Sequence, residues 1–343
     1  MQTDNLRIGR THPLISPAVL EEELPRSDAA SECVSAARET LENILWGNDQ
    51  RFVAVVGPCS IHDPDAALEY AERLRTLADQ ISSEIFCVLR VYFEKPRTVV
   101  GWKGLINDSG LDGTFQINRG LRLARRLLND VADMGLPAAT EFLDNTFGQY
   151  FTDLISWGAI GARTVESQIH RELASGLSMP IGIKNRTDGD VQVAVDAIRA
   201  AAHRHLFPTL TKEGAPAIVE TTGNPCCHLV LRGGSEPNYD RRSVAAAQAL
   251  LQGAGLADTL MVDCSHANSG KDPARQPAVA RDVVAQRMAS NPGLRGIMVE
   301  SNLVAGRQDI GAALVYGQSI TDACLGFDDT RTLLLEIAES LAG

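Results

Sequence analysis

Long apolar runs are missing from this 343-residue chain. No stretch approaches the roughly 18 uncharged residues that a membrane-spanning helix needs. The N-terminal segment also lacks the apolar core that signal peptides carry. We therefore expect a cytoplasmic protein without a membrane partner.

Positive charge is also scarce, because 32 Lys and Arg residues face 43 Asp and Glu residues and give a formal net charge of -11. This balance argues against nucleic acid as a partner, although a local basic cleft for an anionic metabolite is allowed. The patterns GxGxxG and GxxxxGK(S/T) are absent, which removes the usual support for nucleotide binding. The seven cysteines are scattered and odd in number, unlike a disulfide framework, so we expect free thiols.

The chain is long enough for two domains or for one large α/β barrel. Residues 1–50 are polar, and we interpret them as an extension that contains a helix from Ser31 to Ile44 with Ser31 as its N-cap. From Arg51 onward, short β-branched runs alternate with amphipathic helical stretches, as in βα units. Eight such runs predict a (β/α)8 TIM barrel over residues 51–343: FVAVV, FCVLRVYF, PAATEF, GAIGA, PIGIK, HLVLR, LMVDCSH and GIMVE.

Two further short runs, PTLT and AIVET, flank residues 212–214. They are typical of a hairpin, so we expect an inserted β-hairpin at about residues 206–222, outside the barrel. No internal repeat, long linker or low-complexity tract indicates a second independently folded domain.

Active sites of this barrel class lie at the C-terminal ends of the strands, so polar residues that close apolar runs are the candidates. The runs end on Cys59, Arg90, Glu141, Arg163, Lys184, Arg232, His266 and Glu300, and Lys95 and Arg97 follow the second run. One such cation alone is more often a surface residue than a ligand contact. Together, however, they would repel one another unless an anion were bound, which indicates a phosphate or carboxylate substrate.

Four residues suited to a first-row divalent metal form a second group: Cys59, His266, Glu300 and Asp322. They are far apart in the sequence, so their spacing is not diagnostic. The alternative is that Cys59 is a small buried hydrophobe and His266 a hydrogen-bonded core histidine. Convergence of the four residues at one rim of the barrel favours the metal interpretation.

Several segments closely resemble the type I 3-deoxy-D-arabino-heptulosonate 7-phosphate (DAHP) synthases. They are GPCSIHDP (57–64), RVYFEKPRTVVGWKGLINDS (90–109), GAIGARTVESQIHRELASGLSMPIGIKNRTDG (158–189), LRGG (231–234), DCSHANSGK (263–271), MVES (298–301) and YGQSITDAC (316–324). The resemblance implies condensation of phosphoenolpyruvate with erythrose 4-phosphate, the first step of the shikimate pathway, on a metal-bearing barrel. It maps the metal ligands onto Cys59, His266, Glu300 and Asp322.

The same resemblance implies the substrate contacts. It places phosphoenolpyruvate against Arg90, Lys95, Arg163, Lys184 and Arg232, and the aldehyde substrate near Lys95, Pro96, Arg97 and Thr98. The catalytic residues would be Lys95 as proton donor, Glu141 as the group that orients water, and the metal-binding pair Cys59 and His266. The metal remains open among manganese, iron, cobalt and zinc.

Regulation and assembly are expected from the resemblance alone. The family builds an aromatic amino-acid feedback site from the extension, the hairpin and positions that correspond to Asn145, Gln149, Ser178, Phe207 and Thr209. The effector remains open among phenylalanine, tyrosine, tryptophan or none. The extension of the family packs between subunits, so a homodimer or homotetramer is expected. Two other functions stay open: the sister reaction with arabinose 5-phosphate, and a catalytically silent aromatic amino-acid sensor.

Overall fold

A computed structural model of the chain describes residues 1–97, 99–311 and 313–343. Eight parallel strands close into a barrel in the order β1-β10-β9-β8-β5-β4-β3-β2. The strands are β1 (Phe52–Gly57), β2 (Ile85–Arg90), β3 (Ala138–Glu141), β4 (Trp157–Ile160), β5 (Ile181–Lys184), β8 (Cys227–Leu231), β9 (Leu260–Asp263) and β10 (Leu294–Glu300). Each matches one of the eight apolar runs, so the predicted (β/α)8 barrel is confirmed.

The strands are apolar because both of their faces are buried, which is usual for parallel sheets. Every residue of β1 is buried, and so is every residue of β10. The side chains that point into the barrel form one packed cluster, in which Trp157 is the largest: Val53, Val55, Val88, Tyr92, Ala139, Trp157, Ala159, Val230, Met261 and Met298. The barrel therefore has a solid core, and a cavity can open only at one of its ends.

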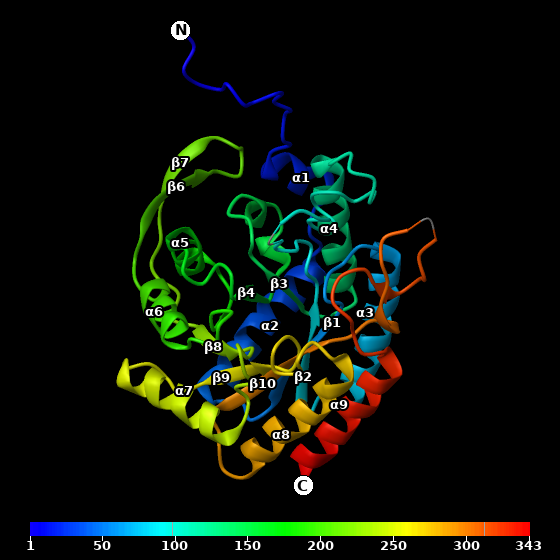
Figure 1. Ribbon diagram of the computed structural model, residues 1–343, viewed down its shortest axis with the longest axis vertical. Helices are drawn as coiled ribbons and strands as arrows, with labels where there is room; N and C mark the ends of the chain where they lie inside the picture. The colour runs from blue at the N-terminus through cyan, green and yellow to red at the C-terminus, as the bar shows by residue number, and fades with distance from the viewer. Residues whose placement is uncertain (98, 312) are drawn as a thin grey trace.

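Helices cover the outside of the barrel, as Figure 1 shows. They are α3 (Pro64–Gln80), α4 (Ile117–Asp133), α5 (Gln168–Gly176), α6 (Gln192–Ala201), α7 (Arg241–Gly253), α8 (Gln276–Met288) and α9 (Phe327–Ala342). The connection from β3 to β4 carries the 3-10 turns η1 (Phe147–Tyr150) and η2 (Thr152–Leu154), and η3 (Pro273–Arg275) precedes α8. Among the described helices, none has the length and apolarity needed to cross a membrane. The seven cysteines are unpaired.

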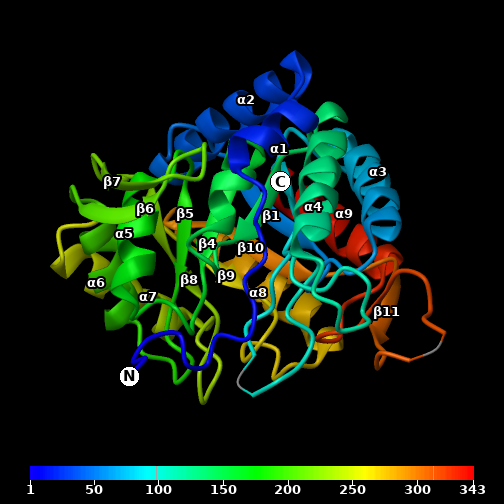
Figure 2. The ribbon, with the colours of Figure 1, turned by 90° about the horizontal axis from the view of Figure 1, so that it is seen from above.

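The N-terminal residues form α1 (Pro17–Glu23) and α2 (Asp28–Trp46). The expected N-cap of the longer helix, Ser31, is wrong: α2 begins one turn earlier, because the Ser27 hydroxyl accepts from the backbone N–H of Ala30. Leu41 and Ile44 of α2 pack against the interior cluster of the barrel. Helix α2 therefore closes the N-terminal end of the barrel, which we call the floor, and it lies opposite the loops that follow β2 and β10 (Figure 2). We call the C-terminal end the mouth.

The predicted hairpin is present as β6 (Leu206–Leu210) and β7 (Pro216–Glu220), an antiparallel pair inserted between α6 and β8. It stands at the edge of the molecule, beyond α5 and α6 (Figure 1). Its two ends meet, because the N–H of Thr221 donates to the carbonyl of His205 (2.9 Å) and the N–H of His205 donates to the Thr221 hydroxyl (3.0 Å). A second small sheet, β11 (Val304–Arg307) and β12 (Gln318–Ser319), follows β10 near the mouth.

Candidate active site

A cavity of about 220 Å³ opens at the mouth of the barrel. Three carboxylates line it, Glu94, Glu141 and Asp322, together with seven cationic side chains: Arg90, Lys95, Arg97, Arg163, Lys184, Arg232 and Lys271. In a protein whose net charge is -11, this excess of local positive charge marks an anion site.

The strand ends carry most of these cations. Arg90 is the last residue of β2 and Lys184 the last residue of β5, and both are buried. Arg232 comes directly after β8, and Arg163 lies in the loop after β4 with an exposed side chain. The segment after β2 brings Lys95, Pro96 and Arg97 to the cavity, whereas Thr98 lies outside the described residues. Apart from Thr98, all the expected phosphoenolpyruvate and aldehyde contacts share one cavity.

Three of the four expected metal ligands form one tight group. One sulfur or oxygen atom each of Cys59, Glu300 and Asp322 lies within 4.8 Å of the others, and the Cys59 thiol donates to Oδ2 of Asp322 at 3.6 Å. Cys59 can reach this point because Gly57 ends β1 with a φ of 154°. A Cβ at Gly57 would lie 2.7 Å from the backbone oxygen of Arg90, so only glycine fits the turn.

His266 lies beside this group. Its Nε2 is 3.8 Å from Oε1 of Glu300, and its backbone has a φ of 54°, in the left-handed region that non-glycine residues rarely adopt. The N–H of Lys271 donates to the His266 carbonyl at 2.7 Å and holds this turn. A strained backbone that persists beside a charged cavity is typical of functional sites.

The donor set fits a divalent metal. A thiolate, an imidazole and two carboxylates on one side of a cavity suit manganese, iron, cobalt or zinc. The sulfur and the two carboxylates already lie together, and His266 Nε2 is 3.8 Å from one of those carboxylates. Burial and the neighbouring Glu300 carboxylate raise the pKa of the Cys59 thiol, so a cation is needed to stabilise its thiolate.

Lys95 supplies positive charge at this point. Its Nζ lies 2.9 Å from the Cys59 sulfur and 2.7 Å from Oδ2 of Asp322. Burial opposes the charged ammonium, but Cys59, Glu300 and Asp322 outweigh burial and raise the pKa of Lys95. Burial raises the pKa of Asp322, yet the Lys95 ammonium more than offsets this and holds that pKa well below its usual range. These neighbours therefore favour the protonated form of Lys95, which places an N–H donor at the cavity.

Arg90 and Tyr92 form the base of the cavity. An Arg90 Nη atom donates to Glu300 Oε1 at 3.0 Å, and the Arg90 guanidinium lies 3.5 Å from the centre of the Tyr92 ring. The Tyr92 hydroxyl is buried and has no hydrogen-bond partner among the described residues. Glu141 ends β3 and is partly buried at the cavity wall. Burial, with a contribution from Asp144, raises the pKa of Glu94 to about 8.

Sequence reasoning missed Asp263 and Tyr92. Asp263 is the last residue of β9 and is buried against Lys184 and His266. The rule that a polar residue closing an apolar run is functional points to Asp263, if the run LMVDCSH is ended at Asp263 rather than at His266. No sequence signal distinguishes Tyr92 from other buried aromatic residues, because its unpartnered hydroxyl is a property of the folded site.

The expected feedback residues lie away from this cavity. Asn145 and Gln149 are in the connection after β3, and Ser178 follows α5. Phe207 and Thr209 are on β6 of the hairpin. The hairpin turn also contacts these elements, because Lys212 Nζ donates to the Gln149 carbonyl and pairs with Glu21 of α1 at 2.5 Å.

Comparisons with known proteins agree with this geometry. Residues 28–335 match the sequence profile of the DAHP synthetase I family. The chain is 54% identical over 99% of its length to the Phe-sensitive phospho-2-dehydro-3-deoxyheptonate aldolase of Escherichia coli K12, covering 98% of that protein. It is 52% identical to the Trp-sensitive enzyme of Enterobacter agglomerans, with 99% of each chain covered.

The fold agrees as well. A solved structure named phospho-2-dehydro-3-deoxyheptonate aldolase, from Francisella tularensis SCHU S4, superposes with a TM-score of 0.96 at 51% identity, covering 98% of each chain. A profile match over most of the chain, relatives at about 50% identity and the same barrel lead to one conclusion. The chain belongs to the DAHP synthetase I family.

Proposed function

We propose that the protein condenses phosphoenolpyruvate with D-erythrose 4-phosphate and water. The products are 3-deoxy-D-arabino-heptulosonate 7-phosphate and inorganic phosphate, and the reaction is the first step of the shikimate pathway. The observation that carries this proposal is the cavity in which seven cations lie beside the group formed by Cys59, Glu300 and Asp322. Both substrates are phosphorylated anions, so each needs such cations. Family membership and the names of the relatives support the same reaction.

We assign the two substrates to neighbouring parts of the cavity. Phosphoenolpyruvate contacts the cations of the strand ends and of the segment after β2: Arg90, Lys95, Arg163, Lys184 and Arg232. The aldose phosphate contacts Lys95, Pro96 and Arg97, and Arg97 is exposed at the rim of the cavity. Two anions held side by side by fixed cations lose little orientational freedom when they react, which supplies much of the rate gain.

A divalent metal is part of the proposal. Cys59, His266, Glu300 and Asp322 would hold it, and the ion is manganese, iron, cobalt or zinc. When bound, it supplies Lewis-acid polarisation of the aldehyde oxygen.

The chain's own residues carry the proton transfers. As C3 of phosphoenolpyruvate forms a bond to the aldehyde carbon, Lys95 Nζ donates a proton to the aldehyde oxygen. Water adds to C2, and Glu141, on the cavity wall, orients this water and takes its proton. The resulting intermediate releases phosphate by breaking the C2–O bond to the phosphate group, and the proton of its C2 hydroxyl leaves with the phosphate, so that the 2-keto acid remains. Arg90 and Lys184, both buried, hold the charged groups of phosphoenolpyruvate in place during these steps.

A metal-dependent assay tests the proposal. The purified protein is stripped with a chelator, and loss of phosphoenolpyruvate and release of phosphate are followed with erythrose 4-phosphate before and after addition of Mn²⁺. Metal-restored turnover with erythrose 4-phosphate is expected. Turnover with arabinose 5-phosphate alone would instead assign the sister reaction. Binding of an aromatic amino acid without turnover of either sugar would assign a silent sensor.

We further propose that an aromatic amino acid inhibits the enzyme at a site built from Asn145, Gln149, Ser178, Phe207 and Thr209. The contacts of the hairpin with α1 and η1 support a shared pocket there. The relatives are sensitive to phenylalanine, tryptophan or tyrosine at similar identities of 54%, 52% and 50%, so similarity alone does not select the effector. Titration of each amino acid into the assay identifies it, and insensitivity to all three would refute the site.

Assembly and location complete the proposal. Residues 1–50 form an extension to the catalytic barrel of residues 51–343, and this extension contributes to a homodimer or homotetramer. The exposed apolar side chains of the N-terminal segment, Leu6, Ile8 and Leu14, support such an interface. The enzyme acts in the cytoplasm. Analytical ultracentrifugation tests the assembly, and a monomer at micromolar concentration would contradict it.

A further inference from the structure

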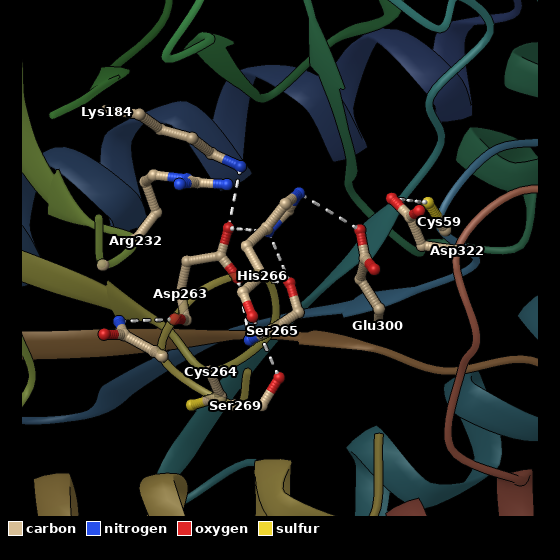
Figure 3. Close-up of polar contacts among 12 residues, drawn as sticks. Cys59, Lys184, Arg232, Asp263, Cys264, Ser265, His266, Ser269, Glu300 and Asp322 are labelled. Atoms are coloured by element: carbon tan, nitrogen blue, oxygen red, sulfur yellow. Dashed lines mark hydrogen bonds and ion pairs between the residues drawn. The ribbon is translucent and has the colours of Figure 1, made fainter. Parts of the chain in front are cut away.

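One buried carboxylate, that of Asp263, joins two parts of the site. Asp263 is the last residue of β9 and is 1% exposed. Oδ2 accepts from Lys184 Nζ at 2.8 Å and lies 2.9 Å from Nδ1 of His266. Oδ1 accepts from the backbone N–H of Ser265 at 3.0 Å and from its hydroxyl at 2.5 Å. Figure 3 shows the carboxylate between the lysine and the imidazole.

The hydrogen bonds around Nδ1 fix the tautomer of His266. The Ser265 hydroxyl lies 2.7 Å from Nδ1 but gives its proton to Asp263, so it offers only a lone pair to the imidazole. Both neighbours of Nδ1, the carboxylate and the hydroxyl, are therefore acceptors, and Nδ1 carries the proton. The lone pair then resides on Nε2, the nitrogen that faces Glu300. This is the tautomer that a metal ligand requires.

The same oxygen also holds Lys184. The lysine side chain is 4% exposed and lines the cavity, and its ammonium has Asp263 as its partner. A buried ammonium needs such a partner, because an unpaired charge inside a protein is strongly unfavourable. Movement of the carboxylate would therefore displace a substrate-binding cation together with the imidazole.

We propose that Asp263 is a positioning residue that fixes the His266 imidazole in its Nδ1-protonated form and ties it to Lys184, so that one carboxylate sets both the metal site and the phosphoenolpyruvate site. This inference rests on the proposed function, because the metal and phosphoenolpyruvate are assigned there. The alternative is that Asp263 is only the counter-ion of Lys184, with no influence on His266.

The double variant D263N/K184M separates these two roles. The two Ser265 donors hold the amide oxygen at the position of Oδ1, so the amide NH₂ faces Nδ1 of His266 and forces the proton onto Nε2. Replacing Lys184 at the same time avoids an unpaired buried ammonium and protects the fold. K184M alone is the matched control, because it removes the counter-ion role and leaves the carboxylate beside His266.

The experiment measures Mn²⁺ binding without turnover. Apoproteins of the wild type, K184M and D263N/K184M are titrated with Mn²⁺, and the free ion is followed by electron paramagnetic resonance. Thermal melts by circular dichroism check that each variant is folded. We expect K184M to bind Mn²⁺ within a few-fold of wild type and D263N/K184M to bind about 10–100-fold more weakly. Long-range ¹H–¹⁵N spectra of histidine-labelled apoprotein should show the His266 proton on Nδ1 in wild type and on Nε2 in the double variant.

The outcomes are distinct. Equal Mn²⁺ affinity of K184M and D263N/K184M, or an unchanged His266 tautomer, would overturn the positioning role and leave the proposed function intact. A wild-type protein that takes up no Mn²⁺, Fe²⁺, Co²⁺ or Zn²⁺ would refute the metal site itself and, with it, both proposals.

Discussion

At the mouth of the barrel, His266 lies on a left-handed backbone between the Asp263 and Glu300 carboxylates. At the floor, His228 of β8 is buried among neutral partners: the indole N–H of Trp157 donates to its Nε2 at 3.3 Å, and its Nδ1 lies 3.3 Å from the Cys226 carbonyl. Burial lowers the pKa of His228 to about 4. The same side chain thus serves as a neutral packing group at one end and as part of a charged site at the other.

This contrast extends to the surroundings of the two histidines. The floor is closed by α2, whose Leu41 and Ile44 join the apolar interior of the barrel. The mouth instead keeps several charges buried in pairs, such as Arg90 with Glu300 and Lys184 with Asp263. Buried ion pairs are a poor way to stabilise a fold, so their concentration at one end indicates that the mouth is built for binding and the floor for stability.

The largest effect is expected from Lys95→Met at the mouth. Loss of the proton donor should reduce kcat by about 10²–10⁴-fold. The fold and Mn²⁺ uptake should be retained, because the four ligand side chains remain. Phosphoenolpyruvate consumption gives the rate, and metal analysis after gel filtration gives the Mn²⁺ content. A near-normal rate would remove Lys95 from the proton-donor role.

Cys59→Ala should have the next largest effect. Loss of a direct ligand should weaken Mn²⁺ binding by about 100-fold or more, beyond the ~10–100-fold typical of a residue that only supports a ligand. Cys324→Ala is the matched control, since Cys324 is also a buried thiol near the mouth but is outside the ligand group. Full metal-dependent activity in Cys59→Ala would show that the proposed coordination is wrong.

At the floor, His228 should make the fold sensitive to acid. Its folded-state pKa of about 4 lies below the ordinary value of 6.5. Its contribution to stability is therefore complete above pH 6.5 and is lost as the pH falls toward 4, because the unfolded state binds the proton first. The loss should reach about 2 kcal/mol at pH 5.

The variant His228→Gln isolates this contribution. Glutamine can still accept from the Trp157 indole and donate to the Cys226 carbonyl, but it cannot be protonated. Urea unfolding at pH 7 and pH 5 should therefore show a smaller loss of stability in the variant than in wild type. Equal losses in both proteins would assign the acid sensitivity to other groups.

The smallest effect is expected from Gly47→Ala at the end of α2. Gly47 has a φ of 85°, and a Cβ there would lie 2.5 Å from Nη2 of the buried Arg295. The strain should cost about 1 kcal/mol in unfolding free energy. It should leave kcat and the KM for phosphoenolpyruvate unchanged, since the floor takes no part in the reaction. A change in either kinetic constant would contradict the view that the floor serves stability and the mouth serves the reaction.

Much of the fold followed from pattern. The eight buried runs predicted the barrel strands because a strand buried on both faces is continuously apolar, and the short runs around residues 212–214 predicted the hairpin. The helix start was misplaced because Ser27 and Ser31 are one turn apart and both are good N-caps. Only the hydrogen bond of Ser27 to Ala30 distinguishes them.

The sequence predicted which residues form the site but not which of them contact one another. Arg90, Lys184 and Glu300 end strands, so the barrel rule identified them. Asp263 was missed, because the contact that marks it out is with Lys184, which lies far away in the sequence, in addition to that with His266. The contact with His266 also depends on the left-handed backbone of His266, which its residue type does not predict. The sequence pattern identifies which side chains reach the mouth, whereas three-dimensional packing decides which of these side chains contact one another.

The joined ends of the hairpin insertion have a consequence for how such an enzyme can change. Because His205 and Thr221 are hydrogen-bonded to each other, β5 and β8 remain neighbours whatever length of chain lies between those two residues. The entropy cost of a longer loop grows only slowly with length, so this segment can be exchanged or extended with little penalty to the barrel. Under the proposed feedback site, changes in this insertion would alter effector sensitivity while the barrel strands that carry the mouth stay unchanged, and a foreign sensor domain could be inserted at the same junction.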